Sequence, residues 1–423
     1  MKSNLLAPTR RDFIKTSAAG MAGVLAGKSV IFAARAGRRL KVGLIGCGSR
    51  GNAALDNCKE SVQHIRGLQL QVVATADWFK GKAEARGKKE GVPASRCFGG
   101  ADAYKKLLET DVDVVLMATP PVFRPLHFEA AVRAGKHIFM EKPVAVDPPG
   151  GRKILAAGEL AKKKGLSVVA GTQRRHQASY RRNAYAIDKG AIGEIVGGAV
   201  YWCGGALWYA KQKPGESDAD YMVRNWVSFA EMSGDHIVEQ HVHNLDVANW
   251  FIGHTPSSAL GFGGRARRKT GNQFDFFSID FDYGKGLHIH SMCRQINGTD
   301  GGIREFFRGT GGGAWGDGRL RGKKIDMPSF PDRNPYVQEH VDLLKSILDG
   351  KPINEAHNVA TSTLTAIMGR ISAYTGKLVR RADIMENKKS PYYNLTLTPT
   401  ALDFEKGDII APEDDVPAIP GKE

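Results

Sequence analysis

Three histidines and three acids are concentrated in residues 233–250, SGDHIVEQHVHNLDVANW. Such a set fits acid–base catalysis by imidazole and carboxylate, a metal site, or a polar cluster with only a structural use. On one continuous helix Glu239 and His243 share a face, whereas His241 points about 200° away from both. In an extended or distorted segment all three side chains could share one face. The chemistry therefore depends on the elements that hold this stretch.

The first 36 residues have the pattern of an export signal. Arg10 and Arg11 in TRRDFIK resemble the twin-arginine consensus S/T-R-R-x-F-L-K, and an Ala/Gly-rich apolar stretch ends at a small-residue cleavage site, Ala34-Arg35-Ala36. Lys28 interrupts the apolar run, which argues against a stable membrane span. We predict a signal over residues 1–36, export of the folded protein by the twin-arginine translocase, and a periplasmic or extracytoplasmic location.

Composition narrows the class of protein. The chain has 423 residues, 42% hydrophobic and 25% charged, which is typical of a globular protein. Its formal net charge is +16, but the densest basic run, GRARRK at 264–269, has no interleaved aromatic residues and is interpreted as a solvated loop. We therefore predict no nucleic-acid partner. The five cysteines form no CxxC pair, which leaves a zinc ribbon and a thioredoxin-like pair without support.

A dinucleotide-binding motif opens the chain that follows the signal. LKVGLIGCGSRG combines a buried strand with three glycines in the G-x-G-x-x-G pattern. The glycines allow a tight turn and let backbone N–H groups approach a pyrophosphate at the start of the next helix. The predicted cofactor contacts of this loop are Gly46, Cys47, Gly48, Ser49, Arg50 and Gly51.

The next strands complete this fold. LQVVATAD ends in Asp77, which is placed to bond the adenosine ribose hydroxyls and thereby favours NAD over NADP, with a helix cap as the alternative. VDVVLMATPP follows, and its C-terminal end brings Thr119 and Pro120 to the cofactor edge. Strands in HIFMEKP and SVVAG alternate with helices over 125–135 and 148–164. The sequence predicts a doubly wound parallel Rossmann sheet over residues 37–171.

The stretch HFEAAVRAGKHIFMEKPVAV, residues 127–146, resembles the Gfo/Idh/MocA oxidoreductases, and the resemblance extends over about residues 38–380. It implies that Lys142 of the EKP motif reaches the substrate hydroxyl beside the nicotinamide, where a cation stabilises developing alkoxide charge. It also implies NAD as the cofactor. His127, Glu141 and Lys142 are the predicted cofactor contacts of this stretch.

The resemblance implies a second, α+β domain with a large, mostly antiparallel open sheet, which we place at residues 172–377. IVGGAVYW, SSALGFGG, FFSIDFDYG, GLHIHSMCR and IREFFRGTG have strand patterns, and two amphipathic helices follow that end at Gly350 and Gly376. In the family this sheet commonly forms the subunit interface, so a homo-oligomer is implied. We interpret residues 378–423 as an extended arm on the surface.

The family pattern D-x-G-x-H-x-x-D-L-x-x-W aligns with the opening stretch. His243 and Asp246 fall on its H-x-x-D, and Glu239 falls on the preceding carboxylate. We predict His243 as the general acid–base and Glu239 as the group that orients its imidazole. His241 stands where the family has glycine, so it is either a substrate hydrogen-bond donor or, with Glu239 and His243, part of a metal site. Acid–base catalysis without a metal ion is our leading prediction, and the metal site is an alternative.

Other polar and aromatic side chains fall near the junction of the two domains. Arg174 and His176 in GTQRRHQ are predicted substrate contacts, with interdomain salt bridges as the alternative. Trp226 is one of several aromatic residues that could stack on the C–H face of a sugar.

These features predict an exported NAD-dependent oxidoreductase that acts on a secondary hydroxyl of a sugar or glycoside, with C3 of a glucoside among the carbons considered. Free NAD is scarce outside the cytoplasm, so we expect the cofactor to be tightly bound and recycled in place. The alternatives are a glycosidase that uses transient oxidation and a non-catalytic sugar-binding protein of the same fold.

Overall fold

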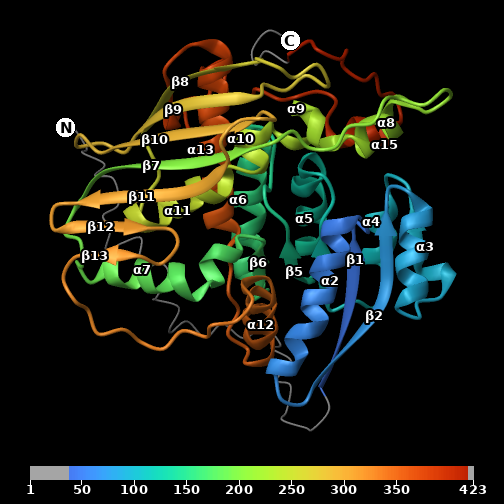
Figure 1. Ribbon diagram of the computed structural model, residues 1–423. Coiled ribbons are helices and arrows are strands. Elements are labelled where there is room, and N and C mark those ends of the chain that lie inside the picture. Colours follow the sequence, from blue (N-terminus) through green and yellow to red (C-terminus); the bar gives the residue numbers. More distant parts are fainter. Residues whose placement is uncertain (1–37, 418–423) are drawn as a thin grey trace, which may run out of the picture.

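The computed structural model describes residues 38–417, so the predicted export signal lies outside the described residues. Two sheets dominate this part of the chain, one in each predicted domain (Figure 1). No helix among residues 38–417 is long and apolar enough to cross a membrane.

The first sheet has six parallel strands in the order β3-β2-β1-β4-β5-β6, which confirms the predicted doubly wound sheet. The last four residues of β1 and all four residues of β4 are buried, because helices cover both faces of the sheet. The bounds are β1 Arg38–Ile45, β2 Leu68–Asp77, β3 Cys97–Gly99, β4 Val114–Met117, β5 His137–Met140 and β6 Val168–Ala170.

The helices of the first domain connect these strands: α2 Ser49–Ser61, α3 Lys80–Lys89, α4 Ala103–Leu108, α5 Arg124–Arg133 and α6 Pro148–Lys163. Short 3-10 turns lie between them, η1 Val62–His64, η2 Ala94–Arg96 and η3 Pro121–Phe123. Asp147 caps α6, because its side chain accepts a hydrogen bond from the Gly150 N–H at 2.8 Å.

Two helices from the second predicted domain also pack on the first sheet. Helix α12 (Pro335–Leu348) buries Val337 and Val341 against the β1 and β4 side, and α13 (Ala356–Thr375) buries Val359 beside α6. The division at residue 171 therefore separates the sheets but not the layers of packed helices.

The second sheet has eight strands in the order β13-β12-β11-β7-β10-β9-β8-β14, and only β7 and β10 run parallel. This confirms a large, mostly antiparallel sheet, with three short strands (β12, β13 and β14) that the sequence patterns did not reveal. The bounds are β7 Ile195–Gly204, β8 Ser258–Gly264, β9 Phe276–Asp282, β10 His288–Gln295, β11 Gly302–Gly309, β12 Gly312–Trp315, β13 Leu320–Arg321 and β14 Val379–Arg380.

One face of this sheet is covered and the other is open. Helices α7 (Ala178–Asp188), α11 (Val242–Ile252) and α13 bury Phe277, Ile279 and Phe281 of β9. On the opposite face Leu260 and Phe262 of β8 are 51% and 67% exposed. The alternation along β8 and β9 is what a half-covered antiparallel sheet requires.

The short helix η4 Gln173–His176 follows the first sheet, and four more short helices lie between β7 and α11: α8 Asp218–Arg224, η5 Trp226–Ser228, α9 Ala230–Ser233 and α10 His236–Glu239. The histidine-rich stretch is thus not one helix. Helix α10 ends at Glu239 and α11 begins at Val242, with Gln240 and His241 between them.

The C-terminal residues differ from the extended arm that we expected. They contain β14, α14 (Arg381–Met385) and α15 (Ala401–Lys406). Leu397, Ala401 and Phe404 join a buried apolar cluster with residues of the first domain and of α8. This segment packs on its own chain because its apolar side chains are regularly placed along short elements.

Candidate active site

The glycine loop between β1 and α2 has the geometry of a phosphate-binding turn. Gly46 has φ +95°, and a Cβ atom there would lie 2.6 Å from the Ala118 carbonyl carbon. A Cβ on Gly51 would lie 1.8 Å from the Gly46 oxygen, so α2 packs directly on the loop. A Cβ on Gly48 would meet nothing within 4 Å. The first and third glycines are required by the fold, whereas the second faces open space.

Asp77, at the end of β2, holds this loop in place. Its Oδ2 accepts the Cys47 N–H at 2.7 Å and its Oδ1 accepts the Phe79 N–H at 2.9 Å. Burial raises the pKa of the Asp77 carboxyl, and the two backbone bonds and the Lys82 charge oppose that shift. Each oxygen keeps a lone pair, so the carboxylate can still accept a ribose hydroxyl.

A cleft opens over the loop and is lined by residues of both domains. The open space at Gly48 and the carboxylate at the end of β2 fit a dinucleotide. The lining residues include Gly46, Gly48, Asp77, Trp78, Tyr104, Thr119, Pro120, Phe123, His127, Val223 and Trp226.

His127 forms part of the cleft wall as a neutral ring. It stacks on Tyr104 with centroids 4.1 Å apart, and its Nδ1 is 3.3 Å from the Thr119 hydroxyl. Burial lowers the pKa of His127 to about 3, with the Arg124 charge acting in the same direction. The Arg124 guanidinium donates to the Thr119 carbonyl at 2.6 Å and so fixes the end of β4.

Arg50 and Glu141 bind each other. The Arg50 Nε donates to Glu141 Oε1 at 2.5 Å, and the guanidinium lies 4.7 Å from the Tyr336 ring centroid. A Cβ on Gly171 would lie 2.4 Å from Glu141 Oε2, so this carboxylate is tightly enclosed. The pair connects the start of α2, whose first residue is Ser49, to the end of β5.

Lys142 meets Glu239 across the domain junction. Its Nζ donates to the Glu239 carbonyl at 2.6 Å and lies 3.0 Å from Glu239 Oε1. The two side chains are only 14% and 13% exposed, so water screens the pair weakly. Glu239 therefore positions the lysine, rather than the His243 imidazole as the sequence suggested.

His243, on the first turn of α11, is a buried neutral base. Its pKa lies well below the usual 6.5 because of burial, followed by the charges of Lys142, Arg174 and Arg50. The ring lies parallel to Trp202 at 16°, with centroids 5.8 Å apart. Its Nδ1 has no hydrogen-bond partner. A neutral imidazole beside a lysine can accept a proton from an alcohol.

His241 points elsewhere. It is fully buried, its Nε2 is 2.7 Å from the Ser291 hydroxyl of β10, and burial lowers its pKa to about 3. Within the described chain, no group of three or more His, Cys, Asp or Glu side chains is placed to hold a metal ion. The break at Gln240–His241 turns this ring into the core, so the structure does not join it with Glu239 and His243.

The basic residues after β6 form buried ion pairs. Arg174 binds Glu305 of β11, and His176 lies 2.7 Å from Asp342 and 3.2 Å from Glu355. The His176 pKa is raised to about 10, because Glu355 and Asp342 outweigh the opposing effect of burial. These residues therefore form salt bridges rather than free substrate contacts, but every partner lies within residues 172–377, so the pairs are not the interdomain ones that the alternative predicted. Arg175 is likewise engaged, by Asp246.

Residues 40–172 match the Gfo/Idh/MocA family, described as an oxidoreductase family with an NAD-binding Rossmann fold. The first domain is similar to this family. It is therefore an NAD-binding Rossmann domain, as the sequence predicted.

Relatives of the Gfo/Idh/MocA domain include enzymes of sugar and polyol chemistry. The chain is 27% identical over 217 residues to dTDP-3,4-didehydro-2,6-dideoxy-alpha-D-glucose 3-reductase of Actinomadura kijaniata, a match over 51% of this chain and 56% of that protein. It is 24% identical over 267 residues to scyllo-inositol 2-dehydrogenase (NAD(+)) of Bacillus subtilis, over 60% and 70%. The match therefore spans little more than half of the first relative.

The two-domain architecture matches as well. A structure of levoglucosan dehydrogenase in complex with NADH and levoglucosan superposes with a TM-score of 0.63, over 81% of this chain and 99% of that one. The identity is 17%, so this likeness concerns the fold.

The sequence patterns did not predict where some residues of the site lie. Trp226 lines the cofactor cleft instead of the region around His243, and Val223 lines the cleft beside it. Trp202, one of the aromatic residues expected to stack on a sugar, packs on the His243 ring. No local pattern identifies such contacts, because the partners come from elements far apart in the sequence.

Proposed function

We propose that the protein is an exported NAD-dependent oxidoreductase of sugars or glycosides that oxidises a secondary hydroxyl. One observation carries the proposal: Lys142 from the first domain bonds to Glu239 of the second, four residues before the buried His243 imidazole. Lys142 follows β5, at the carboxyl edge of the sheet that also holds the glycine loop. In sheets of this type that edge binds the ligand.

The side chains divide the chemistry between them. His243 accepts the proton of the substrate hydroxyl, and the Lys142 ammonium stabilises the negative charge that develops on the oxygen. Glu239 holds the lysine by two contacts. NAD supplies the hydride acceptor, so the C–H bond breaks as the carbonyl forms. The products are a ketosugar, NADH and protonated His243.

The substrate class rests on the relatives and on the donor set. The names of the two curated relatives describe a deoxysugar 3-reductase and an inositol 2-dehydrogenase. We propose a sugar or glycoside with C3 as the oxidised carbon. Export through the twin-arginine pathway then favours NAD(H) that stays bound and is recycled in place by a second substrate.

The open face of the second sheet supports a homo-oligomer. Leu260 and Phe262 are exposed at neighbouring positions of the same face of β8. Apolar side chains exposed together mark interaction surfaces more often than scattered ones do. A second copy of this chain is the proposed partner.

The deciding experiment follows deuterium. Native enzyme loaded with NAD is incubated with glucosides that carry deuterium at C3, and the released nucleotide is analysed by mass spectrometry. We expect deuterium on NADH and a ketosugar that keeps its aglycone. Release of the aglycone would instead support a glycosidase, and the lack of transfer from every sugar would contradict the proposal.

A further inference from the structure

The two walls of the cofactor cleft come from different parts of the chain. One wall belongs to the first domain and includes Trp78, Tyr104 and Phe123. The other consists of Val223 and Trp226, from α8 and η5. A nucleotide in this cleft is therefore enclosed only while the second wall stays against the first.

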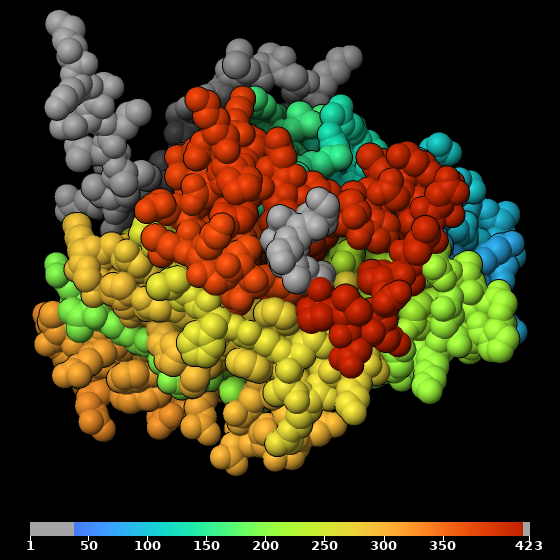
Figure 2. Space-filling model, turned by 90° about the horizontal axis from the view of Figure 1, so that it is seen from above, coloured from blue at the N-terminus to red at the C-terminus, as the bar shows by residue number. Residues whose placement is uncertain are grey.

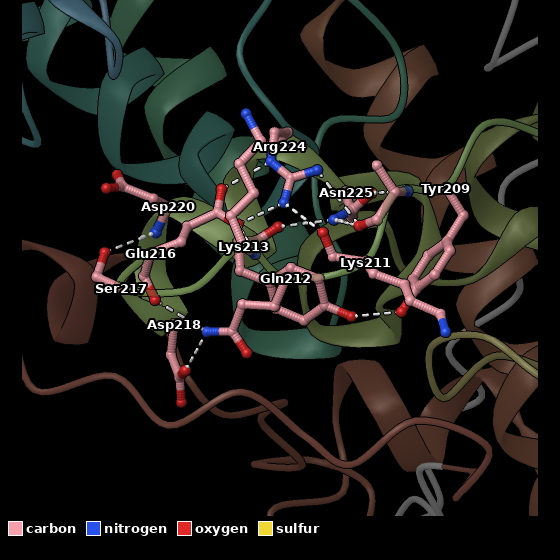
Figure 3. A network of polar contacts seen from close by, with 12 residues as sticks. Tyr209, Lys211, Gln212, Lys213, Glu216, Ser217, Asp218, Asp220, Arg224 and Asn225 are labelled. Carbon is pink, nitrogen blue, oxygen red and sulfur yellow. Dashed lines mark hydrogen bonds and ion pairs between the residues drawn. The ribbon is translucent and has the colours of Figure 1, made fainter.

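One direct bond joins the walls. The Trp78 indole N–H donates to Asp220 Oδ1 of α8 at 2.6 Å. At the end of α8, Arg224 forms an ion pair with Glu216, and the Asn225 side-chain amide donates a hydrogen bond to the Ala210 carbonyl at 2.9 Å (Figure 3). This network fixes the loop before α8 and gives the second wall a defined position.

Residues 397–415, which we call the clasp, pack against the first wall from outside. Phe404 is buried, with its ring edge-on to Trp78 at 5.7 Å and to Phe123 at 5.2 Å between centroids. Glu405 accepts hydrogen bonds from the Tyr104 hydroxyl and the Lys105 ammonium, each at 2.8 Å. Two side chains of the clasp, Phe404 and Glu405, thus support residues that line the cleft.

The same segment then crosses to the second wall. The Ala411 N–H donates to Asp218 Oδ2 at 2.8 Å, and Asp414 accepts the hydroxyls of Tyr209 and Tyr221. Figure 2 shows the red C-terminal chain lying over the surface between the yellow-green and the cyan parts of the molecule. The clasp therefore contacts both walls of one cleft.

We propose that the clasp is part of the cofactor site and retains NAD(H) by keeping the two walls together. Movement of Trp226 and Val223 away from Trp78 exposes the cleft, and this movement must break the contacts of Phe404, Ala411 and Asp414. The clasp thus slows nucleotide release without touching the reacting atoms. The inference rests on the proposed function, in which this cleft holds NAD(H) through many turnovers.

The test measures NADH release directly and needs no sugar substrate. The full-length protein is loaded with NADH, energy transfer from the tryptophans beside the cleft to NADH is recorded, and excess NAD is added as a chase. Phe404→Ala and Asp414→Asn are compared with Leu402→Ala, which changes a 52% exposed side chain of the same helix. We expect release to become about tenfold faster in the first two variants, because loss of enclosure acts mainly on the dissociation rate.

Each outcome has one meaning. Faster release in Phe404→Ala and Asp414→Asn, with an unchanged rate in Leu402→Ala, supports the clasp. Release within twofold of the wild type in Asp414→Asn, a substitution that removes a charge but little volume, overturns it, whatever the folding of Phe404→Ala. If the wild-type protein shows no energy transfer to NADH at all, the proposed function itself fails, which is a separate result.

Discussion

Burial and three cations keep the imidazole of His243 neutral, and the neutral form is the one that accepts a proton. Because the pKa is depressed, protonation of the base begins only well below pH 6.5. We therefore expect kcat/KM for sugar oxidation to show no acidic limb centred at or above pH 6.5. A pH–rate profile with the folded enzyme checks this, and a midpoint near the ordinary histidine pKa would contradict it.

Replacing the same residue tests its role as base. We expect His243→Asn to lower the rate of NADH formation by about 10²- to 10⁴-fold, the usual contribution of a positioned acid–base group. NADH binding should persist, because His243 does not line the cofactor cleft. His254→Asn, at an exposed histidine just beyond the end of α11, is the matched control. Equal rates for both variants would remove His243 from the mechanism.

At the residue level, the sequence indicated Lys142, Glu239 and His243 but not how they pair. Glu239 and His243 share a face only if the helix continues through Gln240, and the chain breaks there. The carboxylate consequently binds the lysine. The position of the His241 ring was not predicted for the same reason, because the break in the helix turns the ring toward Ser291. Side-chain partners across domains do not follow from local spacing.

At the scale of elements, the second and third glycines of the G-x-G-x-x-G motif, Gly48 and Gly51, should respond differently when each is replaced by alanine. Gly48 has φ −75° and open space around its Cβ position, so we expect Gly48→Ala to keep the wild-type melting temperature while NADH binds more weakly. Gly51→Ala places Cβ against the Gly46 oxygen and should lower the melting temperature of the protein without nucleotide. Thermal unfolding and NADH titration of both variants measure the contrast. Equal melting temperatures for the two variants would contradict it.

The elements were predictable where apolar residues form a clear run or alternate with polar ones. Five of the six strands of the first sheet and β7 to β11 match the sequence patterns, whereas β3, β12, β13 and β14 were not predicted. Helix α15 had a readable signal, the capping box formed by Thr400 and Asp403. The capping box predicts the helix but not what the helix packs against, because only the folded chain shows that Phe404 packs beside the cofactor cleft.

On the scale of the whole molecule, the domains inferred from the sequence describe the sheets better than the packing. Helix α12 follows the second sheet in the chain but covers the first sheet beside α2. It also brings Glu339 and His340 into the interior near Arg50. The boundary near residue 171 was visible as a change of strand pattern. The packing of α12 on the first sheet could not be predicted from the sequence, because an amphipathic helix can cover either sheet.

The packing of α12 on the first sheet buries His340, and neither ring nitrogen has a hydrogen-bond partner. The stability of the fold therefore depends on pH. Burial lowers the His340 pKa to about 3, so the unfolded chain takes up a proton below pH 6.5 that the folded protein does not, and stability falls as pH falls. The loss is on the order of 1 kcal/mol between about pH 6.5 and 5.5 for one such histidine. His176 acts in the opposite direction, because its raised pKa makes its contribution fullest below pH 6.5 and lost toward pH 10.

The contribution of His340 is isolated by a difference between variants. We expect His340→Leu to lose less unfolding free energy than the wild type between these two pH values, by about 1 kcal/mol, because its site no longer titrates in the unfolded chain. His254→Leu, at an exposed histidine beyond the end of α11, is the matched control. Urea unfolding of all three proteins at both pH values gives the slopes. If the slope of His340→Leu equals that of the wild type, the buried ring is not held neutral, and α12 does not seal this face of the first sheet from water.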